Sequence, residues 1–272
     1  METLTATAEM QATKEIKKEV KLECYKVAKE YPTPKGPYVV LEDFNLQVKE
    51  EEFISIIGHS GCGKSTILTM IAGLNSITRG NILVDGLRIN GPGPDRAVVF
   101  QSPSLMPWMT AMENVMLGVD EVFPHIAKKE REDICKYYLT KVGLGNAFDK
   151  KATDMSNGMR QRVGIARAFA LKPEVLLLDE PFGMLDSLTR NELQEVLMEV
   201  WLQEKITAVM VTHDVDEAIY LSDRVIMMTG GPYAKVGDVL NVKLPRPRIK
   251  KEVLEHKDYY GYRDYLINFL NE

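Results

Sequence analysis

The chain has 272 residues, of which 45% are hydrophobic and 27% charged, and its 39 acidic side chains exceed its 34 basic ones for a formal net charge of −5. This length can bury a sizeable core, and the hydrophobic fraction excludes a disordered protein. The acidic balance argues against a nucleic-acid partner, because neutralising phosphates takes an excess of Lys and Arg.

Cysteine spacing and hydropathy indicate the compartment. Cys24, Cys62 and Cys135 are too few and too far apart for a disulfide framework, which suggests a reducing environment. No apolar run approaches the roughly 20 residues that a bilayer span needs. The N-terminus lacks the apolar stretch of a signal peptide. A soluble cytoplasmic protein is therefore the first expectation.

Short strand signals crowd the start of the chain. Residues 1–20 are polar and are expected to form a tail. Strand-like segments follow at 21–28, 38–41 and 44–48, with a turn-rich stretch rich in Pro and Gly at 31–37. This pattern predicts an antiparallel sheet.

Continuous apolar runs then alternate with helical patterns. Such runs are typical of parallel strands that are buried on both faces. The helical pattern at 189–204 carries an apolar stripe that we expect to pack against the sheet. The alternation predicts an α/β core. The runs lie at 53–57, 97–100, 175–178, 208–211 and 225–228.

Strand signals disappear between about residues 103 and 170, where 130–142 and 158–171 have helical patterns. We therefore expect a helical insertion in the α/β core. The predicted organisation is a tail at 1–20, one domain at 21–250 with its helical part at about 103–170, and a short helical C-terminal tail at 251–272.

A glycine-rich loop at 58–66 matches the pattern G-x-x-x-x-G-K-[ST] and stands between an apolar strand and a helix. Backbone N–H groups of such a loop surround phosphate oxygens, and the helix N-terminus adds its positive dipole. Lys64 is expected to reach the β- and γ-phosphates and Ser65 to bind Mg²⁺. The expected phosphate-binding residues are Gly58, His59, Ser60, Gly61, Cys62, Gly63, Lys64, Ser65 and Thr66. We interpret Cys62 as a loop-filling side chain.

Two acids, Asp179 and Glu180, end the apolar run at 175–178. A carboxylate at the end of a buried strand is costly unless it meets a cation. Asp179 fits the carboxylate on the Mg²⁺ side of a phosphate-loop enzyme. Glu180 is placed to polarise an attacking water.

The segment Met155-Ser156-Asn157-Gly158-Met159-Arg160-Gln161-Arg162 resembles the signature of the ATP-binding-cassette (ABC) ATPases, which reads Leu-Ser-Gly-Gly-Gln before the same Arg-Gln-Arg run. Gln101, Leu185-Asp186 and His213 follow the family's order, and the resemblance covers about residues 21–230. It implies an α/β fold: a RecA-like P-loop NTPase core with an N-terminal antiparallel β subdomain and an inserted α-helical subdomain.

The resemblance also implies roles for single residues. Glu180, His213 and Gln101 would be the catalytic set, with ATP and Mg²⁺ as cofactors. Ser65, Gln101 and, through water, Asp179 would hold the metal. Tyr31 would stack on adenine, with Tyr25 as the alternative. A second copy would supply Ser156, Asn157, Gly158, Met159 and Asp186.

Three positions depart from the family pattern. Asn157 replaces the first glycine of the signature and Met159 its glutamine, and Glu51 replaces a glycine of a turn. We expect Asn157 to preserve the signature loop, because asparagine tolerates left-handed backbone better than other non-glycine residues.

Closure of two cassettes, identical or paired, implies partners: permease subunits and a separate substrate-binding protein, with this chain peripheral on the cytoplasmic side of the membrane. A cytoplasmic permease helix would dock near Gln101. The apolar segment 104–109 either lines that groove or packs inside the helical subdomain.

Segments at 91–96, 105–108, 212–218 and 244–248 resemble the nitrate/sulfonate/taurine/bicarbonate importer subfamily. Those at 57–64 and 227–232 are similar to nitrate and bicarbonate ATPases. Import of nitrate, nitrite or a related small anion is therefore expected, with bicarbonate, taurine or alkanesulfonate as alternatives. A cassette ATPase of DNA repair or ribosomes would need a coiled-coil insertion or tandem cassettes and a basic face. A GTPase would need an Asn-Lys-x-Asp motif, and the sequence has no Asn-Lys pair.

Overall fold

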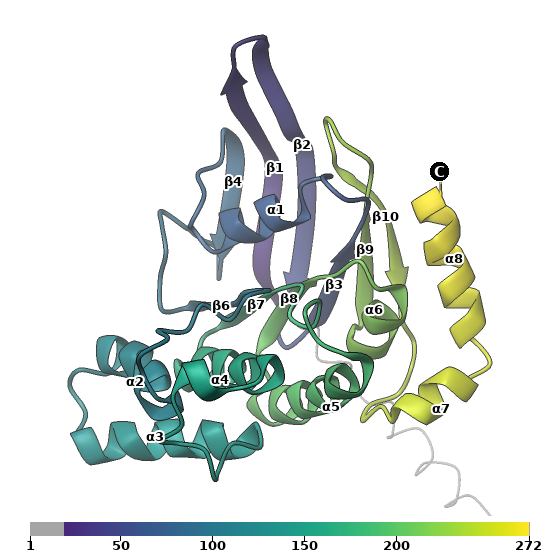
Figure 1. The fold of residues 1–272 in the computed structure, drawn as a ribbon. Helices are drawn as coiled ribbons and strands as arrows, with labels where there is room; N and C mark the ends of the chain where they lie inside the picture. The colour runs from purple at the N-terminus through teal and green to yellow at the C-terminus, as the bar shows by residue number, and fades with distance from the viewer. Residues whose placement is uncertain (1–18, 272) are drawn as a thin grey trace, which may run out of the picture.

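The computed structural model describes residues 19–271, so the expected tail at 1–20 lies almost wholly outside the described residues. The first sheet is antiparallel, in the order β2-β1-β4-β5 (Figure 1). Its strands are β1 (Val20–Thr33), β2 (Gly36–Lys49), β4 (Arg79–Val84) and β5 (Leu87–Arg88).

The β1–β2 hairpin is longer than the sequence predicts. The expected turn at 31–37 shrinks to the residues between Thr33 and Gly36, and Pro32 pairs opposite Pro37 within the ladder. Pairing of β1 with β4 ends at Ala28, so both prolines lie where the ribbon is two-stranded. Prolines are tolerated there because no further strand needs their missing N–H groups.

The second sheet has the order β10-β9-β3-β8-β7-β6. Every neighbouring pair in it is parallel except β9 with β10, so the predicted apolar runs are confirmed as buried parallel strands. The strands are β3 (Phe53–Ile57), β6 (Arg96–Val99), β7 (Val175–Asp179), β8 (Thr207–Val211), β9 (Arg224–Met228) and β10 (Val236–Asn241).

Two apolar cores flank this sheet. One lies among the sheets and α1 (Lys64–Ile71), and the other lies under α5 (Ser187–Glu204) and α6 (Val215–Leu221) (Figure 1). The expected stripe on α5 is buried in the second core, where the Trp201 ring meets Phe53 edge-on at 5.4 Å between centroids.

The helical insertion comprises α2 (Ala111–Val122), α3 (Lys128–Lys141), the 3₁₀ turn η1 (Ala152–Asp154) and α4 (Asn157–Ala170). In Figure 1 these helices gather beside one end of the parallel sheet. Asn114 is buried in α2, and its amide bonds the backbone of Met106 and Met109 in the segment before the helix. That segment is therefore fixed to the insertion.

The chain ends in α7 (Lys250–Glu255) and α8 (Tyr259–Asn271). The arginines of the Pro-Arg-Pro-Arg stretch at 245–248, which precedes these helices, bond other groups of the same chain. The Arg248 guanidinium donates to the carbonyls of Ile219, Tyr220 and Ser222, at the C-terminal end of α6. Buried carbonyls that would lack partners at a helix end are satisfied in this way. Among residues 19–271, no helix is long and apolar enough to cross a membrane.

Candidate nucleotide-binding site

The glycine-rich loop leaves the sheet at Ile57 and enters α1 at Lys64. Gly63, the last residue before the helix, has a left-handed backbone (φ 98°), and a Cβ there would lie 2.8 Å from Val40 Cγ1. Only glycine fits that position without strain. The buried Lys64 ammonium donates to the carbonyls of Gly58 at 2.8 Å and His59 at 2.9 Å. The loop thus curls around its own lysine and keeps the ammonium beside the helix N-terminus.

Cys62 is buried inside this loop. Burial is the main cause that raises the pKa of its thiol, against a smaller lowering by Lys64. A neutral thiol is a poor nucleophile, so the side chain fills space, as the sequence suggests.

Asp179, the last residue of β7, accepts a hydrogen bond from the Ser65 hydroxyl at 2.9 Å. Burial raises the pKa of Asp179 and Glu180 adds to the rise, whereas Ser65 and Lys64 lower it. A bound divalent cation would favour the charged carboxylate. The hydroxyl and the carboxylate are hard oxygen donors of the kind that Mg²⁺ prefers, so this pair fits a magnesium site.

The Glu180 side chain contacts residues that follow two other strands of the sheet, β6 and β8. Its Oε2 accepts a hydrogen bond from Gln101 Nε2 at 3.2 Å and lies 3.3 Å from His213 Nδ1. Glu180 also has a left-handed backbone with φ 42°, which is costly for a residue with a Cβ. The sheet therefore brings the sequence-predicted catalytic residues together on one carboxylate oxygen.

A cavity of about 480 Å³ opens beside these groups. Asp179 and Gln101 do not line it, but each bonds a residue that does. His59 contributes its carbonyl to Lys64, and Cys62 is buried within the loop. The cavity is lined by Val40, Ser60, Gly61, Gly63, Lys64, Ser65, Thr66, Glu180 and His213. Val40 belongs to no sequence motif, so its part in the cavity lining is seen only from its position on β2 in the structure.

The aromatic candidates lie apart from the cavity lining. Tyr31 is 38% exposed on β1, and its hydroxyl accepts a hydrogen bond from Asn75 Nδ2 at 2.8 Å. Tyr25, on the same strand, is 50% exposed. The structure therefore does not place either ring in the cavity itself.

The residues expected to act on a second copy's nucleotide lie at the starts of two helices. Ser156 caps α4, and its Oγ accepts a hydrogen bond from the Met159 N–H at 3.3 Å. Asp186 caps α5 through the N–H groups of Leu188 and Thr189. These hydrogen bonds, that of Thr189 first, lower the pKa of Asp186.

Asn157 is the first residue of the right-handed helix α4. The tolerance of asparagine for left-handed backbone is therefore not needed here, because the position is helical behind the Ser156 cap. Gly158 is the tighter requirement, because a Cβ there would lie 2.5 Å from Thr189 Cγ2 on α5. At Glu51, by contrast, the backbone is left-handed with φ 53°, as the replaced glycine suggests.

Comparison with known proteins decides the family. Residues 41–183 match the family described as ABC transporter. This chain belongs to that family. Over 244 residues, it is 52% identical to the bicarbonate transport ATP-binding protein CmpD of Synechococcus elongatus, covering 90% of this chain and 88% of that protein. It is 49% identical to the nitrate import ATP-binding protein NrtD of the same species, covering 90% of this chain and 89% of that protein.

Solved structures agree. The fold matches the dimeric structure of MJ0796, a bacterial ABC transporter cassette, with a TM-score of 0.73 and 32% identity over 82% of this chain and all of that one. A post-hydrolysis MJ0796 dimer bound to ADP and Pi matches with the same score and 31% identity over the same shares of the two chains. The chain is an ABC ATPase, and the mixed α/β fold and the resemblance inferred from its motifs are confirmed.

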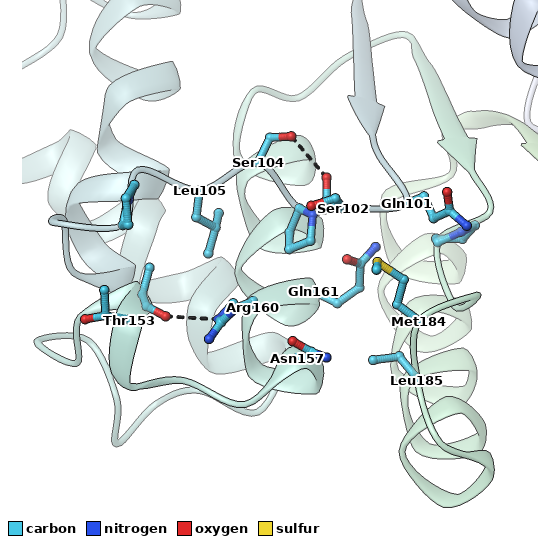
Figure 2. A pocket seen from close by; sticks show the side chains of 14 residues that line it. Gln101, Ser102, Ser104, Leu105, Thr153, Asn157, Arg160, Gln161, Met184 and Leu185 are labelled. Atoms are coloured by element: carbon cyan, nitrogen blue, oxygen red, sulfur yellow. Dashed lines mark hydrogen bonds between the residues drawn. The ribbon is translucent and has the colours of Figure 1, made fainter.

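A second cavity of about 440 Å³ lies between the segment after β6, the start of α4 and the start of α5 (Figure 2). Gln101, Leu105, Asn157 and Leu185 are among its lining residues. Trp108, next to this region, is 67% exposed. Within the segment 104–109, Leu105 packs on the helical core and lines the cavity, while Trp108 faces solvent. Docking of a permease helix there stays a prediction.

Gln161 is a residue whose role the motif reading missed. It is buried in α4, and its Nε2 donates to the Phe100 carbonyl at 3.1 Å. It ties the signature helix to the backbone just before Gln101. Nothing in the local sequence, a glutamine between two arginines, predicts this bond to a residue 61 positions earlier.

Proposed function

We propose that this ABC ATPase powers an importer of a small planar oxyanion such as nitrate or bicarbonate. The observation that carries the ATPase part is the convergence of Gln101 and His213 on Glu180 Oε2, beside a cavity that also holds Lys64. Relatives described as bicarbonate and nitrate transport proteins support the anion part.

In the proposed mechanism, ATP enters the 480 Å³ cavity with its phosphates on the loop. Lys64 exchanges its two carbonyl partners for phosphate oxygens, which bind an ammonium more strongly. Ser65, Gln101 and, through a water, Asp179 would hold Mg²⁺, which would supply charge neutralisation at the phosphates. Tyr31 stacks on the adenine.

Glu180 is the proposed general base. Its carboxylate takes the proton of the attacking water, while Gln101 and His213 fix the carboxylate and sense the γ-phosphate. Ser156 and Gly158 of a second copy would cap the γ-phosphate, since a helix N-terminus favours an anion. Loss of the γ-phosphate would remove those contacts and reopen the dimer.

Permease subunits are the proposed target of this closure. The second cavity is lined by Gln101 and by the start of α4. A cytoplasmic permease helix bound there would therefore move when the two ATPase copies close on ATP. The chain would then lie against the cytoplasmic face of the membrane, and a separate binding protein would deliver the anion.

The test of the ATPase part is Glu180→Gln. We expect hydrolysis to fall about 100-fold or more while ATP affinity is kept, because general-base catalysis contributes that much. Glu174→Gln is the matched control, since this acid immediately precedes the other end of β7. Turnover by Glu180→Gln at the rate of the control would contradict the assignment.

The anion part is tested on the transporter assembled with its permease and binding protein. Nitrate or bicarbonate should stimulate ATP hydrolysis, and taurine should not. Stimulation by taurine alone would replace the proposed substrate class with a sulfonate.

A further inference from the structure

Lys29 lies on β1 two residues before Tyr31, on the same face of the strand. It is 6% exposed, which is unusual for a lysine, and its ammonium lies 4.8 Å from the centroid of the Tyr31 ring. The same ammonium donates to the Ser76 carbonyl at 2.6 Å and to its hydroxyl at 3.3 Å. The ammonium is therefore held between the Tyr31 ring and Ser76.

The Tyr31 ring is held at a second point. Its hydroxyl accepts the hydrogen bond from Asn75, the neighbour of Ser76 in the loop after α1. This loop is itself tied to β1, because Thr78 N–H donates to the Ala28 carbonyl and Glu30 N–H to the Thr78 hydroxyl. The Tyr31 ring and its strand are thus bonded to the loop that follows α1, the helix that begins at the phosphate loop.

We propose that Lys29 and Asn75 are positioning residues that hold the Tyr31 ring ready for a purine base, with the ammonium on one ring face and the base on the other. This inference rests on the proposed adenine contact of Tyr31. Fixing a ring before binding lowers the conformational cost of binding, and a cation over one face adds attraction of its own. Neither residue needs to touch the nucleotide.

The chain carries a matched comparison on the same strand. Lys26 lies 5.4 Å from the centroid of the Tyr25 ring, so this pair repeats the cation–ring contact. Tyr25 is more exposed than Tyr31, and the Lys26 N–H bonds Asn45 on β2. If a lysine–tyrosine contact acted only through the stability of β1, both pairs would affect nucleotide binding alike.

The experiment measures the Kd of Mg-ATP and of Mg-tripolyphosphate for the full chain. We expect Lys29→Met to raise the Kd for ATP about 3- to 10-fold and to leave that for tripolyphosphate unchanged, because only ATP carries a base. Asn75→Leu should raise the Kd for ATP about 2- to 5-fold, as Tyr31→Phe should. Lys26→Met should change neither constant.

A double-mutant cycle separates positioning from general stability. Tyr31→Ala should raise the Kd for ATP about 10-fold, and Lys29→Met should add nothing in that background. The inference is overturned if Lys29→Met leaves the Kd for ATP unchanged, weakens tripolyphosphate equally, or still acts without the ring. If Tyr31→Ala itself leaves ATP binding intact, the adenine contact in the proposed function fails, and the positioning role fails with it.

Discussion

The nucleotide-binding side and the signature side of this molecule are organised differently. On the first, functional side chains bond across elements: Ser65 of α1 to Asp179 of β7, and Gln101 after β6 to Glu180. On the second, Ser156 and Asp186 each accept hydrogen bonds from their own helix. The residues of the first side line one cavity or bond a residue that lines it, whereas the second side presents capped helix starts.

This difference supports the proposal of a site that is divided between two copies. Cross-bonding between strand ends fixes a catalytic group before any ligand arrives, which lowers the cost of reorganisation during the reaction. A helix start offers N–H groups and a positive dipole to an anion from outside. We infer that the nucleotide-binding side acts on ATP in its own chain and that the signature side acts on ATP bound to another copy.

The largest expected effect on ATP hydrolysis comes from Lys64, on the nucleotide-binding side. Lys64→Met removes the buried ammonium beside the phosphate loop, and we expect ATP hydrolysis to fall at least about 100-fold, since preorganised charge is worth that much. ATP affinity should fall as well, as measured by equilibrium binding. The control is Lys251→Met on α7, and equal turnover by the two variants would show that the loop does not need this charge.

A smaller effect is expected where the signature side packs on α5. Gly158→Ala places a Cβ 2.5 Å from Thr189 Cγ2. After a gain in helix propensity of up to about 1 kcal/mol, we expect a net loss of about 1–2 kcal/mol in the free energy of unfolding in urea. Thr189→Ser removes that methyl group and should restore stability to the double variant. A loss of equal size with serine at position 189 would disprove the steric account.

The last effect depends on pH and concerns the helix that follows His213. Burial is the main cause that raises the pKa of Glu217 on α6 to about 7, and Asp214 adds to the rise. A raised acid pKa means that the folded state binds the proton more tightly, so the free energy of unfolding falls as the pH rises from about 4.5 to 7. Glu217→Gln removes this penalty.

We therefore expect Glu217→Gln to be more stable than the wild type by at least about 1 kcal/mol at pH 8, and by at most the roughly 3 kcal/mol of the full shift, with little difference at pH 4.5. Urea unfolding at the two pH values measures it. A gain that is the same at both would assign the effect to packing instead of ionisation.

The sequence predicts the nucleotide-binding side better than the signature side for physical reasons. A phosphate loop and an acid at a strand end obey local rules, so Gly58–Thr66, Asp179 and Glu180 can be identified without coordinates. Parallel strand order then brings Gln101 and His213 to Glu180, because their strands end at the same edge.

Contacts between distant elements could not be predicted. The tight fit of Gly158 against Thr189 depends on how α4 packs on α5, and the backbone at Asn157 depends on the Ser156 cap. From the sequence alone, Lys29 would be a solvated lysine on a strand. In the structure its ammonium donates to the carbonyl of Ser76, in the loop after α1. Tertiary packing decides each of these, and none leaves a periodic signal.

The divided site is tested most directly by mass measurement in solution with and without ATP, using Glu180→Gln and the double variant Glu180→Gln/Ser156→Arg. We predict that Glu180→Gln is a dimer in ATP and a monomer without it. At a protein concentration too low for dimerisation, the double variant should bind ATP with the same Kd as Glu180→Gln. At higher concentration it should remain a monomer, because its bulky cation blocks the helix start that would meet the partner's γ-phosphate. An ATP-dependent dimer of the double variant as stable as that of Glu180→Gln would contradict the account.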